Sequence, residues 1–159
     1  MRRKDKQVSG EEELGRIILA SPYVVVGFHA ESSPYLVPLD FGFDGKYVYV
    51  HCAHEGRKLD LLRENPDVSL LFVDYGGVQK ESGETNACAC TTKYASVMTR
   101  GRAFIVDDNE GKKEAFSAIL RRFGMDGMPF KSGMLERTCV VKIEILEMTG
   151  KRSPASPKA

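Results

Sequence analysis

The sequence predicts a mainly β fold of the α+β class: a six-stranded split β-barrel with flanking helices. Short apolar runs rich in β-branched residues recur along the chain, and helical segments interrupt them at irregular places. A parallel sheet would instead show a regular alternation of strand and helix, which is absent. A long alternating run is broken at Gly101, where a bulge would let a barrel turn its corner.

The length of 159 residues fits one domain. We expect residues 1–150 to form the barrel and residues 151–159, rich in Lys, Ser and Pro, to form a flexible tail. The net charge of +1 argues against general nucleic-acid binding. No apolar run of about 18 residues is present, and no hydrophobic segment follows the basic start at Met1, so we expect a cytoplasmic protein without a membrane span.

Two amphipathic segments predict helices that flank the barrel. Glu11–Leu19 carries acidic residues in its first turn, and Ser9 is the expected N-cap. Asp108–Phe123 places its apolar residues on one face.

Most of the remaining regular structure is predicted as strand. Four segments fit strands outside the central hairpin: Tyr23–His29, Val68–Val73, Tyr94–Val106 and Thr138–Ile145. The segment Gly76–Thr92 reads as a long loop, a kind that is usually functional or mobile.

The centre of the chain predicts a hairpin that leads into a helix. The dipeptide Asp44-Gly45 suits a tight turn between two β-rich runs, Tyr35–Phe43 and Tyr47–Cys52. A helix over Lys58–Arg63 follows and must stop at Asn65-Pro66, because proline disfavours α geometry in the residue before it.

Two cations, Arg57 and Lys58, lie where this helix begins. Each faces the positive end of the helix dipole, which is unfavourable by about 0.3–1 kcal/mol. A bound phosphate would reverse that sign, because Gly56 permits close backbone approach and the first-turn N–H groups are free to bind an anion. The alternative interpretation is that both side chains are simply solvated.

Five pieces of the chain, in order, resemble the flavin-binding split barrel of the pyridoxamine-phosphate-oxidase-like superfamily, and in particular its nitroimidazole-resistance (Nim) branch. The pieces are Met1–Asp5, Val37–Gly45, Val50–Leu62, Lys93–Val97 with Gly101–Ala103, and Glu147–Pro154. The resemblance covers nearly the whole chain. It implies a homodimer that holds FMN in two symmetric clefts at the subunit interface.

The resemblance also assigns cofactor-binding roles to particular positions. One group would follow the isoalloxazine edge, a second would wrap the ribityl phosphate, and a third would line the same cleft. These groups are Pro38, Leu39 and Asp40; Cys52, Ala53, His54, Arg57 and Lys58; and Ser96 and Val97.

Three side chains near this cleft leave alternatives open. His51 is either a packed strand-end residue or a cleft residue that contacts the flavin and acts as a catalytic proton donor. For His54 we favour a local hydrogen bond over catalysis. Tyr94 either packs in the core, which we favour, or covers the cleft.

The function that follows is an FMN-dependent oxidoreductase that reduces a small electron-poor organic molecule, with nitro reduction as the model reaction. Its partners would be that substrate and an electron donor. The alternative is a non-catalytic flavin or haem binding module of the same fold, with His51, Cys52 and His54 as possible axial ligands. A deazaflavin is a third cofactor to consider.

The cysteines depart from the family pattern. Cys52 replaces the usual Ser or Thr and so removes a hydroxyl contact to phosphate, and Cys88-Ala89-Cys90 stands where an aromatic lid residue is common. We expect Cys88 and Cys90 to be free thiols in a mobile flap, with no metal bound. The alternative is a zinc site shared with His51 or His54, for which a second close cysteine pair is missing.

Overall fold

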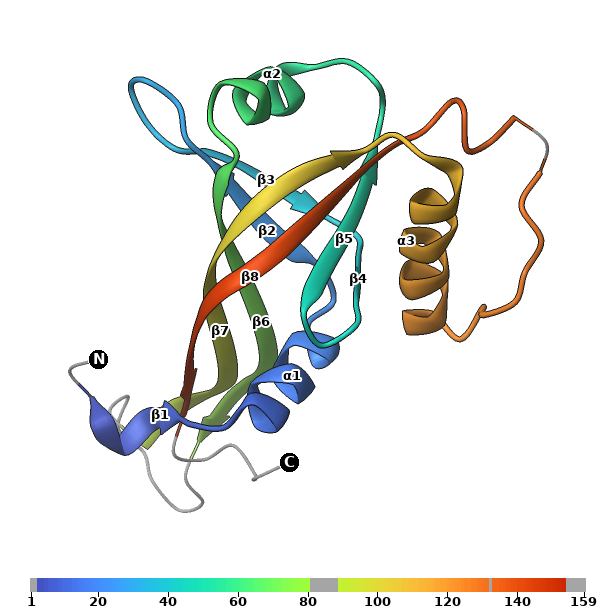
Figure 1. Ribbon diagram of the computed structural model, residues 1–159. Coiled ribbons are helices and arrows are strands. Elements are labelled where there is room, and N and C mark those ends of the chain that lie inside the picture. The colour runs from blue at the N-terminus through green and yellow to red at the C-terminus, as the bar shows by residue number, and fades with distance from the viewer. Residues whose placement is uncertain (1–2, 81–88, 132, 154–159) are drawn as a thin grey trace.

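The computed structural model describes residues 3–80, 89–131 and 133–153. Within them, eight strands form one curled antiparallel sheet, flanked by three α-helices (Figure 1). The split barrel with flanking helices is therefore confirmed. The strand number is eight rather than six, because the expected strand Tyr35–Phe43 is divided in two and a short N-terminal strand joins the sheet.

The strands run in the spatial order β3-β2-β6-β7-β8-β5-β4, and β1 pairs with β8. Their bounds are β1 Gln7–Val8, β2 Val24–Phe28, β3 Tyr35–Leu39, β4 Phe41–Phe43, β5 Tyr47–Cys52, β6 Asp67–Lys80, β7 Cys90–Val106 and β8 Cys139–Arg152. The helices are α1 Glu11–Ala20, α2 Arg57–Glu64 and α3 Asn109–Arg122, with a short 3-10 helix at Lys4–Lys6. No helix in these described ranges is long and apolar enough to cross a membrane.

The predicted turn forms between β4 and β5. One carboxylate oxygen of Asp44 accepts hydrogen bonds from the backbone N–H groups of Lys46 and Tyr47, at 2.9 and 2.7 Å. Gly45 has a φ of +102°, a backbone conformation that favours glycine. The turn therefore fixes the register of β4 on β5, in which Phe41 is the partner of Val50.

The two flanking helices begin differently, and the N-cap predicted for α1 is wrong. Asp108 caps α3, since its carboxylate accepts from the N–H of Gly111 at 2.7 Å. The N-cap of α1 is Gly10 rather than Ser9, with a φ of +106° and no side-chain cap. A glycine in that backbone conformation moves the helix start one residue beyond the serine.

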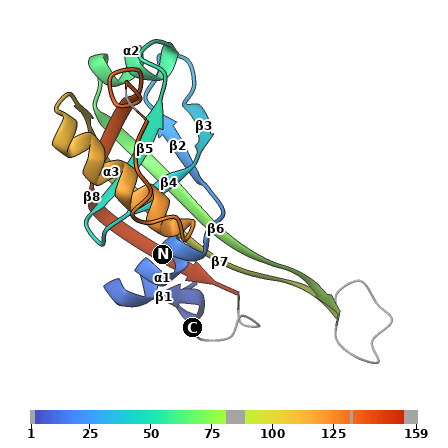
Figure 2. The same cartoon turned by 90° about the vertical axis from the view of Figure 1, so that its right-hand side faces the viewer.

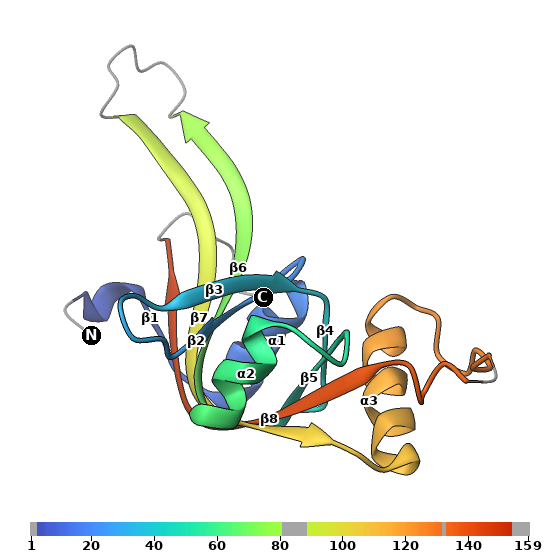
Figure 3. The same ribbon diagram turned by 90° about the horizontal axis from the view of Figure 1, so that it is seen from above.

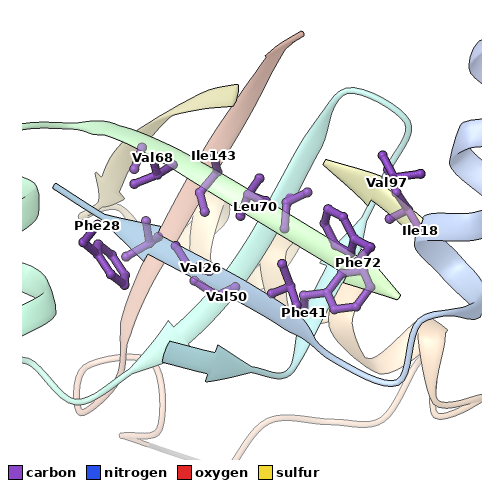
Figure 4. Close-up of a cluster of buried hydrophobic side chains, with 14 of the residues drawn as sticks. Ile18, Val26, Phe28, Phe41, Val50, Val68, Leu70, Phe72, Val97 and Ile143 are labelled. Atoms are coloured by element: carbon purple, nitrogen blue, oxygen red, sulfur yellow. The ribbon is translucent and has the colours of Figure 1, made fainter. Parts of the chain in front are cut away.

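The main core fills the inside of the curled sheet. Figure 4 shows how β2, β6, β7 and β8 direct aliphatic side chains toward Phe41 and Phe72, whose rings meet edge to face with centroids 5.1 Å apart. Helix α1 covers one end of this core through Leu14, Ile17 and Ile18. A smaller second cluster lies on the outer side of β5, where Tyr49 and Val140 pack beneath Phe116 and Ile119 of α3.

Both described ends of the segment expected as a long loop are strand: Gly76–Lys80 belongs to β6 and Cys90–Thr92 to β7. Strands β6 and β7 stay paired from Asp67 with Arg102 to Lys80 with Cys90, and a bulge at Gly76 and Gly77 shifts the register. The pair extends well beyond the rest of the sheet (Figures 2 and 3). The expectation of a mobile flap at Cys88 falls outside the described residues, whereas Cys90 begins β7 and is an exposed free thiol.

Two further features concern the ends of the strands. The bulge predicted at Gly101 is confirmed by a register shift between Arg100 and Gly101 on β8. The tail expected to be flexible from Lys151 onward is paired strand as far as Arg152, because Lys151 pairs with Gln7 of β1. Residues 154–159 lie outside the described part of the chain.

Replacing Gly42 with Ala should destabilise the protein by roughly 1–3 kcal/mol, the usual cost of overpacking. A Cβ at Gly42 would lie 2.5 Å from the backbone nitrogen of Ile119, so α3 would have to move away from β4. The matched control is Gly15→Ala in α1, where a Cβ meets only ordinary contact at 3.6 Å. This control should stabilise by up to about 1 kcal/mol. Urea unfolding measures both, and wild-type stability in Gly42→Ala would contradict the packing described.

Candidate cofactor site

The candidate site lies where the barrel splits. Strand β3 pairs with β2 up to its last residue, Leu39, which is the partner of Val24. Strand β4 begins two residues later at Phe41 and pairs with β5 instead. Leu39 and Cys52 nevertheless line the same small apolar cavity, together with Lys58 of α2. The split is therefore bordered by β3, the end of β5 and the start of α2 (Figure 3).

Strand β3 forms one border of the split and offers a free backbone edge. Within the described residues it pairs with β2 alone. Pro38 and Asp40 are exposed, and Leu39 is half-buried. Pro38 has no N–H, so it can offer only its carbonyl. Neighbouring residues of an extended strand direct their backbone groups alternately to its two edges, so only every second residue of β3 faces the split. This edge can hydrogen-bond a flat ring without using side chains.

The first turn of α2 forms the second border. Gly56, with a φ of +125°, caps the helix without any side-chain hydrogen bond, and its carbonyl accepts from Leu59 N at 2.9 Å. The N–H groups of the first turn precede the helical ladder and point out of its end. Neither Arg57 nor Lys58 forms an ion pair with any residue in the described part of the chain. This arrangement suits an anion.

The two cations lie on different sides of the helix start. The exposed Arg57 places its guanidinium over the ring of Tyr35 on β3, 4.9 Å from the ring centre. Lys58 is half-buried and close enough to Cys52 to favour its thiolate. Arg57 therefore ties α2 to the start of β3, and Lys58 lies over the mouth of the split.

The Cys52 side chain faces the barrel interior rather than the loop that follows it. It packs against the main core, and burial together with the neighbouring Cys139 raises the pKa of its thiol. Ala53 and His54 are exposed on the loop. A phosphate at α2 can therefore meet backbone N–H groups of this loop, while the Cys52 thiol stays in the core.

The two histidines have different surroundings. The His51 ring is exposed on the outer side of β5, 5.6 Å from the ring of Phe116 between centroids. His54 donates its Nε2–H to the backbone carbonyl of Glu136 at 2.9 Å, so the local hydrogen bond favoured for it is confirmed. The His51 ring therefore lies on the face of β5 opposite to Cys52, whose side chain lines the cavity at the split.

Sequence reasoning missed Arg122, at the end of α3. Its guanidinium lies 4.2 Å from the centre of the Phe41 ring and donates a hydrogen bond to the carbonyl of Ser21. Burial lowers the pKa of Arg122, and the nearby Asp40 carboxylate acts in the opposite direction. A basic residue in the last turn of a helix is an ordinary dipole partner, so the sequence carries no signal of this contact.

Ser96 and Val97 do not meet the other predicted site residues within one subunit. The pairings Leu39–Val24, Val24–Phe72 and Phe72–Val97 place Val97 level with Leu39 but three strands away, about 14 Å across the sheet. Val97 is fully buried and Ser96 is half-buried. One subunit therefore brings Ala103 of β7 to the cavity at the split, but not the part of β7 that carries Ser96 and Val97.

The zinc alternative is not supported by the positions of the described ligands. Val140 pairs both with His51 and with Val106, the last residue of β7, whereas Cys90 is the first. Strand β7 has 17 residues, and His51 of β5 lies near the end of β7 that is opposite to Cys90. Within the residues that the structure describes, no group of three or more His, Cys, Asp or Glu side chains could hold a metal ion.

Comparison with known proteins identifies the family of this chain. The family model described as pyridoxamine 5'-phosphate oxidase matches residues 10–152. The chain belongs to this family. A search of the curated proteins found no match.

Among solved structures, this family member is similar to a candidate 5-nitroimidazole antibiotic resistance protein from Bacteroides thetaiotaomicron. The identity is 27%, with 92% of this chain and 86% of that chain covered and a TM-score of 0.79. It is also similar to the flavocytochrome Anf3 from Azotobacter vinelandii, at 26% identity, 99% and 73% coverage and a TM-score of 0.78. A FAD and heme binding protein from Mycobacterium smegmatis shares the fold at 19% identity, 97% and 76% coverage and a TM-score of 0.78.

Proposed function

We propose that this protein is an FMN-dependent oxidoreductase that reduces a small electron-poor organic molecule such as a nitroimidazole. The observation that carries the proposal is the pair of cations, Arg57 and Lys58, which have no ion-pair partner in the described residues and lie at the start of α2 beside the free edge of β3. A phosphate and a flat ring joined by a short polar chain fit these two borders of the split.

The spacing along β3 suits such a ligand. Arg57 lies over Tyr35, and Pro38 is three residues further along the strand, about 10 Å away. The phosphate would be held by Arg57, Lys58 and the first-turn N–H groups of α2, through charge-assisted bonds. The ring would follow Pro38, Leu39 and Asp40 through their backbone groups.

When bound, FMN supplies the electron-transfer chemistry, and the protein orients it and tunes its electronic properties. His51, at the end of β5, is the side chain to which we assign proton donation. The guanidinium of Arg122 is held against Phe41 and the Ser21 carbonyl, close enough to Asp40 for the two charges to attract each other.

The relatives support a flavin and a nitro substrate. The relative from Bacteroides is named for resistance to 5-nitroimidazole antibiotics. The relative from Azotobacter is named as a flavocytochrome, and two further proteins of this fold are named as FAD-binding.

The flavocytochrome also favours one second candidate, a haem-binding or non-catalytic flavin module, because its similarity covers 99% of this chain. His51 would be the axial ligand, since His54 is engaged with Glu136. The absorption spectrum of the purified protein and the mass of its released ligand separate the two: a yellow protein releasing FMN supports our proposal, and a Soret band supports the second candidate.

We also propose a homodimer. The outward face of the sheet exposes Leu36, Met98 and Leu146 by 62, 60 and 56%. Ser96 precedes Met98 by two residues and so lies on the same face of β7. A second subunit on this face would cover the apolar side chains and could bring its own Ser96 toward the split, which one subunit does not do.

Removing both cations, as Arg57→Ala with Lys58→Ala, should weaken FMN binding at least about 100-fold. Hydrogen bonds to charged groups contribute about 1.5–3 kcal/mol each, so two of them give at least about 3 kcal/mol. Fluorescence titration with FMN measures the loss. The matched control is Arg63→Ala, in the last turn of the same helix and paired with Asp60 at 2.9 Å, which should bind FMN like wild type. Wild-type affinity in the double variant would overturn the assignment.

Light scattering should give twice the monomer mass of 17.7 kDa. Replacing Met98 with Lys should shift the equilibrium toward monomer, because a charge would then be buried in the interface. The control is Phe123→Lys, an exposed apolar residue just beyond the end of α3 and not on a strand of this face. A stable wild-type monomer with full FMN occupancy would contradict the dimer.

A further inference from the structure

Two cysteines that are far apart in the sequence are direct neighbours in the sheet. Cys52, the last residue of β5, is the register partner of Cys139, the first residue of β8. Antiparallel partners have Cα atoms about 4.5–5.5 Å apart, and disulfides form at Cα separations of about 4.4–6.8 Å. Cys139 belongs to the main core, Cys52 packs against it, and both are free thiols.

The two thiols differ in access. Cys139 is only 3% exposed, whereas Cys52 is half-buried and lines the small cavity at the split. A small reagent that enters at the split would therefore meet Cys52 first. Cys139 would be the resolving thiol, because it is held against Cys52 by the β5–β8 ladder.

The two cysteines lie where the loop before α2 meets the segment before β8. Cys52 leads into the loop before α2, and Cys139 ends the segment whose Glu136 carbonyl accepts from His54. A covalent bond at this point would fix the end of β5 to the start of β8 without requiring either strand to change partner. The two strand ends are already paired, so the disulfide can form without a change in the strand pairing.

We propose that Cys52 and Cys139 are a redox modification site that closes reversibly into a cross-strand disulfide. The oxidant is a low-molecular-weight disulfide. The Cys52 thiolate attacks one of its sulfurs, forms a mixed disulfide and releases the first small thiol. The Cys139 thiolate then attacks the Cys52 sulfur and releases the second. In total, two protein thiols are oxidised and one small disulfide is reduced to two thiols.

The surroundings of Cys52 also set the rate. Burial and Cys139 raise the pKa of its thiol, and Lys58 only partly opposes them. The thiolate fraction at neutral pH is therefore small, so exchange should be slow there. The rate should still increase about tenfold per pH unit above pH 8.5, where the rate of an ordinary cysteine levels off.

The site is tested in the full chain carrying Cys88→Ser and Cys90→Ser, which leaves the two cysteines of the pair. The probe is oxidised glutathione at pH 9. We expect the folded protein to lose both titratable thiols and about 2 Da in mass with no glutathione attached. Dithiothreitol should restore two thiols. Two thiols remaining, or glutathione stably attached to Cys52, would overturn the proposal.

The melting temperature then shows whether the bond fits the native fold. Oxidation should raise it by several degrees, because the bond closes a long loop in the unfolded chain. In the same background, Cys52→Ser should show no such rise. A fall on oxidation, or an equal rise in Cys52→Ser, would contradict a native cross-strand bond. The thiol count does not depend on the proposed flavin, so the two proposals can fail separately.

Discussion

The break in strand pairing at Asp40 is the constraint on which the site depends. If β3 and β4 were one strand paired along β5, as the sequence suggested, the barrel would be closed at this point. Instead β3 pairs with β2, and β4 pairs with β5. This switch leaves β3 with a free edge and exposes the end of β5, and α2 begins beside the opening. The candidate site is a consequence of this topology.

The positive charge at the start of α2 makes the opening between β3 and β5 suited to an anion. Arg57 and Lys58 are placed at the positive end of α2 with no carboxylate partner in the described residues, which is unfavourable in the absence of an anion. A phosphate would be stabilised by both side chains and by the helix N–H groups together. The same two residues that slightly destabilise the helix would thus be the main source of affinity, which is a common arrangement at functional sites.

Local sequence patterns predicted the local structure well. The Asp44-Gly45 turn and the Gly101 bulge each depend on a few neighbouring residues, and both are confirmed. The long pairing of β6 with β7 and the strand beyond Gly150 were missed, because polar or glycine-containing segments become strands only when a partner satisfies their backbone groups.

The candidate site was predictable to a similar extent. Arg57 and Lys58 could be placed at a helix start because that assignment is local, and the structure puts them there. The role of Arg122 could not be predicted, since its contacts with Phe41 and Ser21 join segments that are far apart in the sequence. The neighbouring thiols of Cys52 and Cys139 were missed for the same reason: only the register of β5 on β8 brings them together.

The central claim is that a phosphate at the start of α2 anchors the cofactor. Equilibrium titration of the cofactor-free protein with FMN and with riboflavin tests it most directly, because the two ligands share the ring and differ in the phosphate. If the claim is correct, FMN binds at least about 100-fold more tightly, since two or more charged hydrogen bonds are lost with the phosphate. Equal affinities for FMN and riboflavin would contradict it.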